Sequence, residues 1–137
     1  MDNGKAPLPE VKVLEAGPFT IPITANSIVG TCESGWGVRT ENLVYTTHDD
    51  EEERLFGLVF TIIVEPEKIV SYEKQCAEAK QILLQNFSSA ITDKVMNYVA
   101  TRTARRVHIA TKEYYEGNYK IVVADNGEGT NNIIYKK

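Results

Sequence analysis

The sequence predicts an α+β domain: an antiparallel sheet of about five to seven strands packed against one long, straight or bent, α-helix at about residues 66–101. Three observations lead to this fold class. Apolar residues recur with helical spacing through the middle of the chain, strand-like alternation flanks that segment on both sides, and Leu55–Val64 is apolar in both alternations. We expect the chain order to be β-rich segment, helix, β-hairpin and a short final strand.

The helical segment is the most regular part of the sequence. Its apolar stripe has a spacing of about 3.6 residues, the period of a straight α-helix, and consists of Ile69, Tyr72, Cys76, Ala79, Leu83, Phe87, Ile91, Val95 and Tyr98. Pro66 suits the first helical position, where its missing N–H costs nothing. Asn86, Ser88 and Ser89 favour a break, but the stripe keeps its phase there, so we expect a bent, continuous helix.

The length of this helix suggests association. About 35 residues span roughly 50 Å, whereas a compact domain of this size is roughly 37 Å across. Either the helix breaks, or a partner covers the part that extends beyond its own domain. The alternative is a helix that covers one sheet face within a monomer, because packing alone explains most apolar stripes.

The segment before the helix is rich in strand signals. We expect residues 1–10 to be a flexible arm and residues 11–137 to form a single domain. Val11–Ala16 is a candidate strand, and the alternation of Phe19, Ile21 and Ile23 predicts a second, which Pro22 places at a sheet edge. Further strand signals lie at residues 28–29, 38–40 and 43–47, and we expect a glycine-rich loop with Trp36 at residues 30–37.

The run Leu55–Val64 predicts a central strand with both faces covered. In a single domain with one helix, only one face of the sheet has an obvious cover. The second face then needs another sheet layer, a loop or another subunit, which is a second indication of association.

The segment after the helix also predicts strands. Val107, Ile109 and Thr111 alternate with more polar residues, and the turn signal at residues 116–118 predicts a hairpin whose second strand starts near Tyr119. Ile133–Tyr135 is a candidate for the last short strand. The arginines at residues 102, 105 and 106 suit a helix C-terminus, where the helix dipole favours positive charge.

Composition narrows the class of protein. The chain has 137 residues, a net charge of −4 and ordinary apolar and charged fractions of 42% and 25%. It lacks a long apolar run and an N-terminal signal pattern, and its two cysteines give no disulfide framework. We therefore expect a soluble, cytoplasmic (intracellular) protein with no membrane partner.

The string Tyr119–Gly129 (YKIVVADNGEG) resembles the strand-plus-Asp-x-Gly-x-Gly box of the histidine-kinase, gyrase and heat-shock-chaperone type ATPases. That resemblance implies a carboxylate at Asp125 that binds the adenine amino group, with glycines that let the backbone approach the nucleotide. Upstream, Gln81–Ile91 is similar to the helix that carries their Mg²⁺-binding asparagine, but that position holds Ser89. Only eight residues follow Gly129, so the family's lid and second glycine box have no counterpart, and we do not assign the chain to this family.

We predict no catalytic residues, no metal site and no cofactor. The acidic run Asp49–Glu53 is expected at the solvated tip of a connection between strands, because it lacks the spacing of a calcium loop. An alternative is a small-ligand-binding or catalytic domain for a nucleotide or metabolite, with a pocket between helix and sheet near Trp36. Its candidate residues are Cys32, His108 and Asp125.

A second alternative is single-stranded nucleic-acid binding by basic residues interleaved with stacking aromatics. Its residues would be Arg102, Arg105, Arg106, Lys112 and Tyr119. The net negative charge opposes this interpretation, so we do not expect a nucleic-acid partner.

The functional prediction is a non-enzymatic interaction and assembly protein, which self-associates or forms a subunit of a larger complex or particle. Its partners are protein: further copies of itself or other subunits. The expected interface uses the helix, the second face of Leu55–Val64 and the edge strand around Pro22. The interface candidates are Trp36, Phe19, Ile21, Ile23, Leu83, Phe87, Tyr114 and Tyr115.

Overall fold

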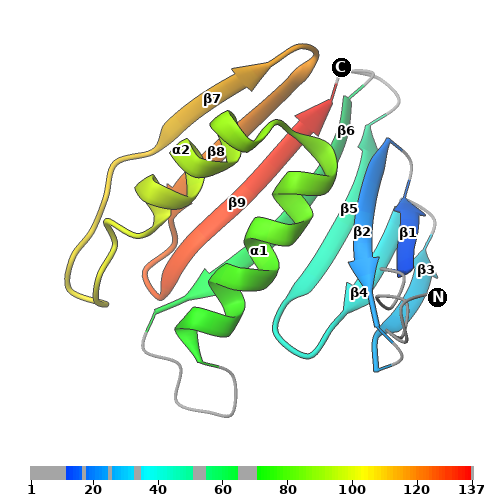
Figure 1. Cartoon of the computed structure of the whole chain (residues 1–137), viewed down its shortest axis with the longest axis horizontal. Coiled ribbons are helices and arrows are strands. Elements are labelled where there is room, and N and C mark those ends of the chain that lie inside the picture. Colours follow the sequence, from blue (N-terminus) through cyan, green and yellow to red (C-terminus); the bar gives the residue numbers. More distant parts are fainter. Residues whose placement is uncertain are drawn as a thin grey trace, which may run out of the picture.

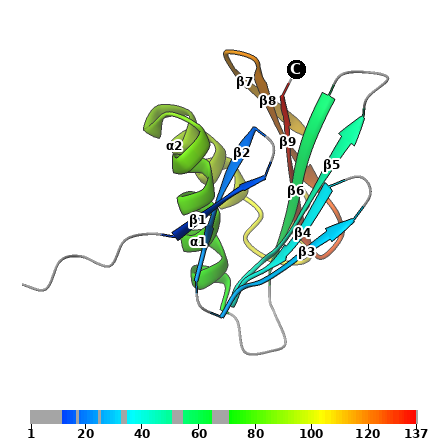
Figure 2. The ribbon, with the colours of Figure 1, turned by 90° about the vertical axis from the view of Figure 1, so that its right-hand side faces the viewer.

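An antiparallel sheet and a helical layer make up the fold in the computed structural model, which describes residues 12–16, 18–24, 26–32, 35–50, 55–64 and 71–136. Within these residues, seven strands form one layer, and two helices with a separate two-stranded hairpin form the other (Figures 1 and 2). The predicted α+β class with an antiparallel sheet is confirmed. The expected arm at residues 1–10 lies outside the described residues.

The large sheet is built from two meanders that meet at its centre. All neighbouring strands run antiparallel. Their order across the sheet is β3 (Ile28–Cys32), β4 (Gly35–Arg39), β5 (Val44–Asp50), β6 (Leu55–Ile63), β9 (Gly129–Lys136), β8 (Tyr119–Asp125) and β7 (Lys112–Glu116). The central position predicted for the apolar run is confirmed, since β6 is the fourth strand. The final strand is longer than predicted and lies beside β6.

The prediction of a continuous helix is wrong, although the segment is helical on both sides of the break. The chain instead forms α1 (Tyr72–Asn86) and α2 (Ser89–Val99), and it breaks where the residues at 86–89 favoured a break. Phe87 is extended, and the Ser88 hydroxyl accepts the Ile91 N–H and so caps α2. Glu116 fixes the break by accepting hydrogen bonds from the N–H and hydroxyl of Ser88.

The break removes the length argument for association. After it, α2 turns back over the β7–β8 part of the sheet (Figure 1). The described helix begins at Tyr72 with Ser71 as N-cap, and the start predicted at Pro66 lies outside the described residues.

The hairpin of β1 (Lys12–Ala16) and β2 (Phe19–Ile23) lies beside α1 in the helical layer (Figure 2). Asn86 of α1 holds the backbone of β2: its Oδ1 accepts the Thr20 N–H at 2.9 Å, and its Nδ2 donates to the Thr20 carbonyl at 2.9 Å. Among the described strands, β2 pairs only with β1, so the edge position that Pro22 predicts for its strand is confirmed.

The core fills the space between the two layers. Its largest fully buried apolar side chains come from both layers: Tyr45, Phe19, Phe60, Ile21, Leu58, Ile62, Ile82, Leu83, Ile121, Ile134 and Val38. Buried residues of α1 and α2 face the same side of the sheet. We call this side the inner face.

Two local predictions differ from the structure. The loop expected at residues 30–37 is strand in its described parts: residues 30–32 belong to β3 and residues 35–37 to β4. Trp36 lies half-buried in β4 against the core. Residues 107–111 are not a strand, and β7 starts only at Lys112. The reason is Arg102, whose guanidinium takes up the Val107 carbonyl and two carbonyls before it.

Candidate functional site

The side of the sheet opposite the helices, which we call the outer face, is the candidate site. Strand alternation puts one row of residues here in register from β5 to β7: Thr46, Val59, Ile133, Val122 and Glu113. A second row contains Gly57, Tyr135, Lys120 and Tyr115. No described element lies over this face, whereas α1, α2 and the β1–β2 hairpin lie over the inner one (Figure 2).

The outer face is apolar at its centre. Val59, Val122 and Ile133 are only half-buried, although they lie in the middle of the sheet. Val44 is 50% exposed, and Ile63 is 38% exposed. Single exposed apolar residues are ordinary, but a contiguous apolar patch indicates an interaction site. The expectation that β6 has both faces covered therefore holds only for the inner face among the described residues.

The rim of the outer face is polar and carries both signs of charge. Lys120 lies 4.0 Å from Glu113 and stands over the Tyr135 ring. Arg39 is exposed at the opposite part of the sheet, on β4. An apolar centre with a polar rim is the usual anatomy of a protein interface.

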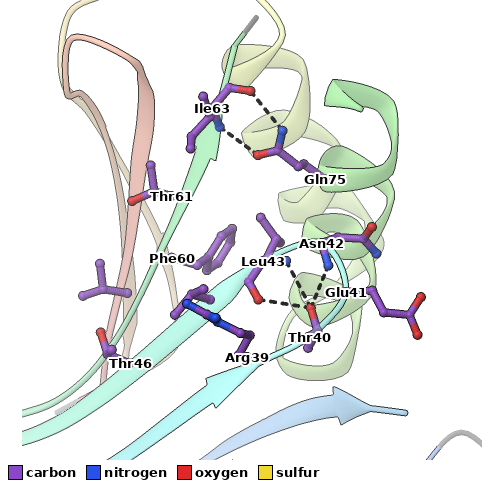
Figure 3. Close-up of a pocket in the computed structure, with 12 residues that line it drawn as sticks. Arg39, Thr40, Glu41, Asn42, Leu43, Thr46, Phe60, Thr61, Ile63 and Gln75 are labelled. Carbon is purple, nitrogen blue, oxygen red and sulfur yellow. Dashed lines mark hydrogen bonds between the residues drawn. The ribbon is translucent and has the colours of Figure 1, made fainter. Parts of the chain in front are cut away.

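A hollow of about 540 Å³ borders the outer face where the turn before β5 diverges from β6 (Figure 3). The last residue of β6 in register with β5 is Phe60, so the end of β6 has no strand neighbour on this side. Gln75 of α1 replaces that neighbour: its Oε1 accepts the Ile63 N–H at 2.9 Å, and its Nε2 donates to the Ile63 carbonyl at 3.1 Å.

Glu78 of α1 fixes the other wall of the hollow. Its carboxylate accepts hydrogen bonds from the Thr40 hydroxyl, the Asn42 side-chain amide and the Tyr45 hydroxyl. Burial raises the pKa of Tyr45, and the Glu78 carboxylate raises it further, so the phenol stays a hydrogen-bond donor. Both walls of the hollow are therefore hydrogen-bonded to α1.

A fully buried arginine organises the opposite end of the sheet. The Arg102 side chain donates to the Gly129 carbonyl at 2.8 Å and to the carbonyls of Ala104, Arg105 and Val107. Its Nη2 also lies 3.4 Å from Asp125 Oδ1. A buried charge with this many partners holds the segment before β7 in place, and its position inside the protein keeps it from contacting a ligand.

Asp125 and His108 form a pair beside this arginine. The His108 Nδ1 lies 2.9 Å from Asp125 Oδ2, which also accepts the Ile109 N–H. The N–H of Gly127 is the main cause that lowers the pKa of Asp125 to about 2, with smaller contributions from Ile109, His108 and Arg102. The carboxylate is thus occupied by its own chain.

The string that resembles the ATPase box therefore serves as a hairpin. It spans β8 and the turn into β9, in which Asn126 Oδ1 accepts the N–H groups of Glu128 and Gly129. The carboxylate that the resemblance assigns to adenine instead binds Gly127 and Ile109.

Most of the predicted interface residues lie inside the chain. Phe19, Ile21, Leu83, Phe87 and Tyr114 are buried in the core, and Ile23 and Trp36 pack against it half-exposed. Of the eight, Tyr115 is the one with an exposed side chain, at 66%, and it lies on the outer face. Packing in or against the core explains the apolar character of the other seven residues.

The ligand candidates do not converge. His108 and Asp125 are in contact, but β3, which carries Cys32, forms the far edge of the sheet from β8. Trp36 lies on β4 beside that far edge. The side chain of Cys32 is outside the described part of the structure.

The nucleic-acid candidates are dispersed as well. Arg102 is buried, Arg105 pairs with Glu128 at 3.4 Å, and Lys112 stands over the rings of Tyr98 and Tyr114. Tyr119 is half-buried against Phe87. Arg106 is exposed.

Sequence reasoning missed Gln75, Glu78 and Arg102 as organising residues. The predicted apolar stripe includes neither Gln75 nor Glu78, and from the sequence Arg102 is expected only as a positive charge at a helix C-terminus. Gln75 is 3% exposed and Arg102 is fully buried. One sequence signal could have identified Gln75. It follows Tyr72 by three residues and precedes Ala79 by four, so this polar residue lies on the apolar side of the helix.

Comparison with known proteins gives no match: no family model fits the chain, and no curated protein or solved structure is significantly similar to it. Within the described residues, no cluster of three or more potential metal ligands is present. The helices of the described part are too short or too polar to cross a membrane.

Proposed function

We propose that this protein is a non-enzymatic assembly protein that self-associates through the outer face of its sheet. The observation that carries the proposal is the apolar row of Val59, Ile133 and Val122 at the centre of that face, over which no described element lies. Val44 and Ile63 add exposed apolar area beside the hydrogen-bonded pair of Thr61 and Asn131. Packing a second sheet on this face would give the protein the second cover that β6 lacks. The product would be a β-sandwich with sheets about 10 Å apart.

The size of the face supports this proposal. Seven strands of five to nine residues, at about 4.8 Å between strands and 3.3 Å per residue, make a face of roughly 700 Å². Stable protein–protein interfaces bury about 800 Å² on each partner. The face therefore approaches the size that a stable dimer needs, provided that the whole of it, rim included, is buried.

The chemistry of the face supports a second copy as the partner. Among the described side chains, the rim carries Arg39 and Lys120 as well as Glu113, so this part of the face has no strong excess of one charge that would select an oppositely charged partner. A twofold interface requires a patch that is complementary to itself. An apolar centre with mixed charges around it meets this requirement.

Two glycines on the same face support close approach by another chain. Gly30 of β3 and Gly37 of β4 are in register, and a Cβ at either position would meet no atom within 4 Å. The fold therefore does not require glycine at these positions. Glycine in a strand commonly marks a place where another backbone approaches closely.

Lysine substitutions on the outer face test this proposal. Val44→Lys and Ile63→Lys place a charge at positions that are already 50% and 38% exposed, so the monomer should tolerate them. We expect either variant to lower the molar mass measured by light scattering. Leu84→Lys, at a 44% exposed position on α1, is the matched control and should leave the mass unchanged. Equal masses for all three variants and the unmodified chain would reject the proposal.

The hollow beside β6 supports a second candidate function, the binding of a small apolar molecule that carries a carboxylate. Its volume of about 540 Å³ lies within the usual range for ligand sites, roughly 300–1,000 Å³. Its lining is largely apolar, with hydroxyls at Thr46 and Thr61 and the guanidinium of Arg39. Octanoate is a suitable probe: we expect it to raise the melting temperature, and Arg39→Gln should abolish this rise. An unchanged melting temperature would exclude this candidate.

A further inference from the structure

The strand edges of this protein differ in how well they are protected. An open strand edge offers unpaired N–H and C=O groups to any extended chain, and proteins block such edges with charges, proline or covering groups. The free edge of β6 is closed by Gln75, and β2 is held by Asn86. The outermost strand β7 carries Lys112, Glu113 and Glu116.

Within the part of the chain that the structure describes, the other outermost strand, β3, has none of these protections. Its residues Ile28–Cys32 include no charge and no proline. Ile28 is 66% exposed and Val29 is 40% exposed. Among the described residues, the backbone partners of β3 belong to β4 alone. An uncharged, apolar, exposed edge of this kind is suited to pair with another strand.

We infer that β3 pairs antiparallel with β3 of a second copy, about a twofold axis at Gly30, to join two sheets into one. In this register Val29 lies opposite the partner's Thr31, and Ile28 lies opposite the partner's Cys32. Val29 and Thr31 are both β-branched, and cross-strand pairs of such residues stabilise sheets; no like charges meet. The twofold axis repeats each of these cross-strand pairs, so both occur twice in the dimer. β3 has no charged residue that would favour a strand of a different protein over a second copy of itself.

This edge contact is separate from the outer-face contact. Edge pairing extends the sheet in its own plane, whereas the proposed function stacks a second sheet upon it. A chain that uses both contacts forms assemblies of at least four copies. A chain that uses only one of the two contacts forms dimers. Substitutions on the outer face and on β3 therefore show separately whether each contact exists.

Charge reversal at Gly30 tests the register. Both Gly30→Lys and Gly30→Glu should fold, because a Cβ there meets no atom within 4 Å. Gly30 lies on the outer face, so the test is made in a chain that carries Val44→Lys, in which the outer-face contact is absent. There each variant alone places like charges opposite each other at the twofold axis, so we expect it to have half the molar mass of the Val44→Lys chain by light scattering. An equimolar mixture should recover the full mass. A Gly30→Lys variant with unchanged mass, or a mixture that stays at half mass, would overturn the inference.

Disulfide trapping provides a second measurement, which accumulates even a weakly populated contact as a covalent dimer. In a chain with Cys32→Ser and Cys76→Ser, Gly30→Cys should form a covalent dimer under mild oxidation, because opposed residues of an antiparallel pair lie within disulfide reach. Gly37→Cys is the control: two copies of residue 37 would be three strand spacings apart, roughly 14 Å. Adding Val44→Lys should leave the trapping unchanged. Equal trapping at residues 30 and 37 would contradict the edge contact.

Discussion

The side-chain amide of Gln75 makes both of the backbone hydrogen bonds that a neighbouring strand would make with Ile63, at 2.9 and 3.1 Å. Asn86 does the same for Thr20 from the other end of α1. Eleven residues separate the two amides, which is about three helical turns, so both project from one side of the helix. A single helix thereby closes one strand edge in each of the two sheets.

Replacing Gln75 by methionine should destabilise the protein although it keeps the side-chain volume. The change leaves the N–H and C=O of Ile63 without protein partners; a fully buried unsatisfied group costs about 1–3 kcal/mol, and the 38% exposure of Ile63 lets water reduce this cost. We expect the free energy of unfolding in urea to fall by about 1–2 kcal/mol. Gln85→Met, at an exposed position of the same helix, should change it by less than about 0.5 kcal/mol. Similar losses for both variants would contradict the role assigned to Gln75.

Arg102 should not tolerate lysine. Its guanidinium reaches four carbonyl groups in different directions, and an ammonium cannot reproduce that geometry. We expect Arg102→Lys to lower the free energy of unfolding by about 3 kcal/mol, a typical cost of disrupting a buried charge network. The exposed Arg106→Lys provides the comparison and should have almost no effect. An Arg102→Lys variant as stable as the unmodified chain would mean that the buried network is not structurally required.

Asp125 should make stability depend on pH in the acid range. Its pKa is about 2 in the folded protein, held there mainly by the Gly127 N–H, and about 3.9 in an unfolded chain. The stabilisation is therefore complete above about pH 4 and is lost as the pH falls through about 2. At pH 6 the unmodified chain should unfold at a higher midpoint concentration of urea than Asp125→Asn. This difference between the two midpoints should shrink at pH 2. A difference that does not change with pH would contradict the assignment.

Two glycines should respond in opposite ways to alanine. A Cβ at Gly129 would lie 1.8 Å from the Ile62 carbonyl oxygen, so the two central strands would have to separate. We expect Gly129→Ala to cost about 3 kcal/mol or more, measured by urea unfolding. Gly30→Ala meets no atom and should be neutral or stabilising by about 0.5 kcal/mol. The same loss at both positions would show that the strands do not pack as described.

The sequence was sufficient for the elements whose periodicity is strong. Leu55–Val64 predicted a central strand, and the alternation at Phe19–Ile23 with Pro22 predicted an edge strand; both are present. The helix break at residues 86–89 was the preferred break point, but the apolar stripe continues in phase across it. Periodicity alone could not show the break, because the Ser88–Glu116 contact that fixes it joins residues far apart in sequence.

The candidate site was less predictable. The expectation of a second cover on β6 came from its sequence, but the residues of the outer face depend on the register of β5, β6, β9 and β8. Aromatic residues such as Phe87 and Tyr114 were expected at an interface, and they fill the core instead. Arg102 was misinterpreted because no local pattern marks an arginine that folds inward to distant carbonyls.

The molar mass of the unmodified chain in solution is the most direct test of the central claim. Light scattering across a series of protein concentrations should give a mass above the 15.3 kDa of one chain, and Val44→Lys should lower it. A mass of one chain at every concentration would contradict self-association through the outer face.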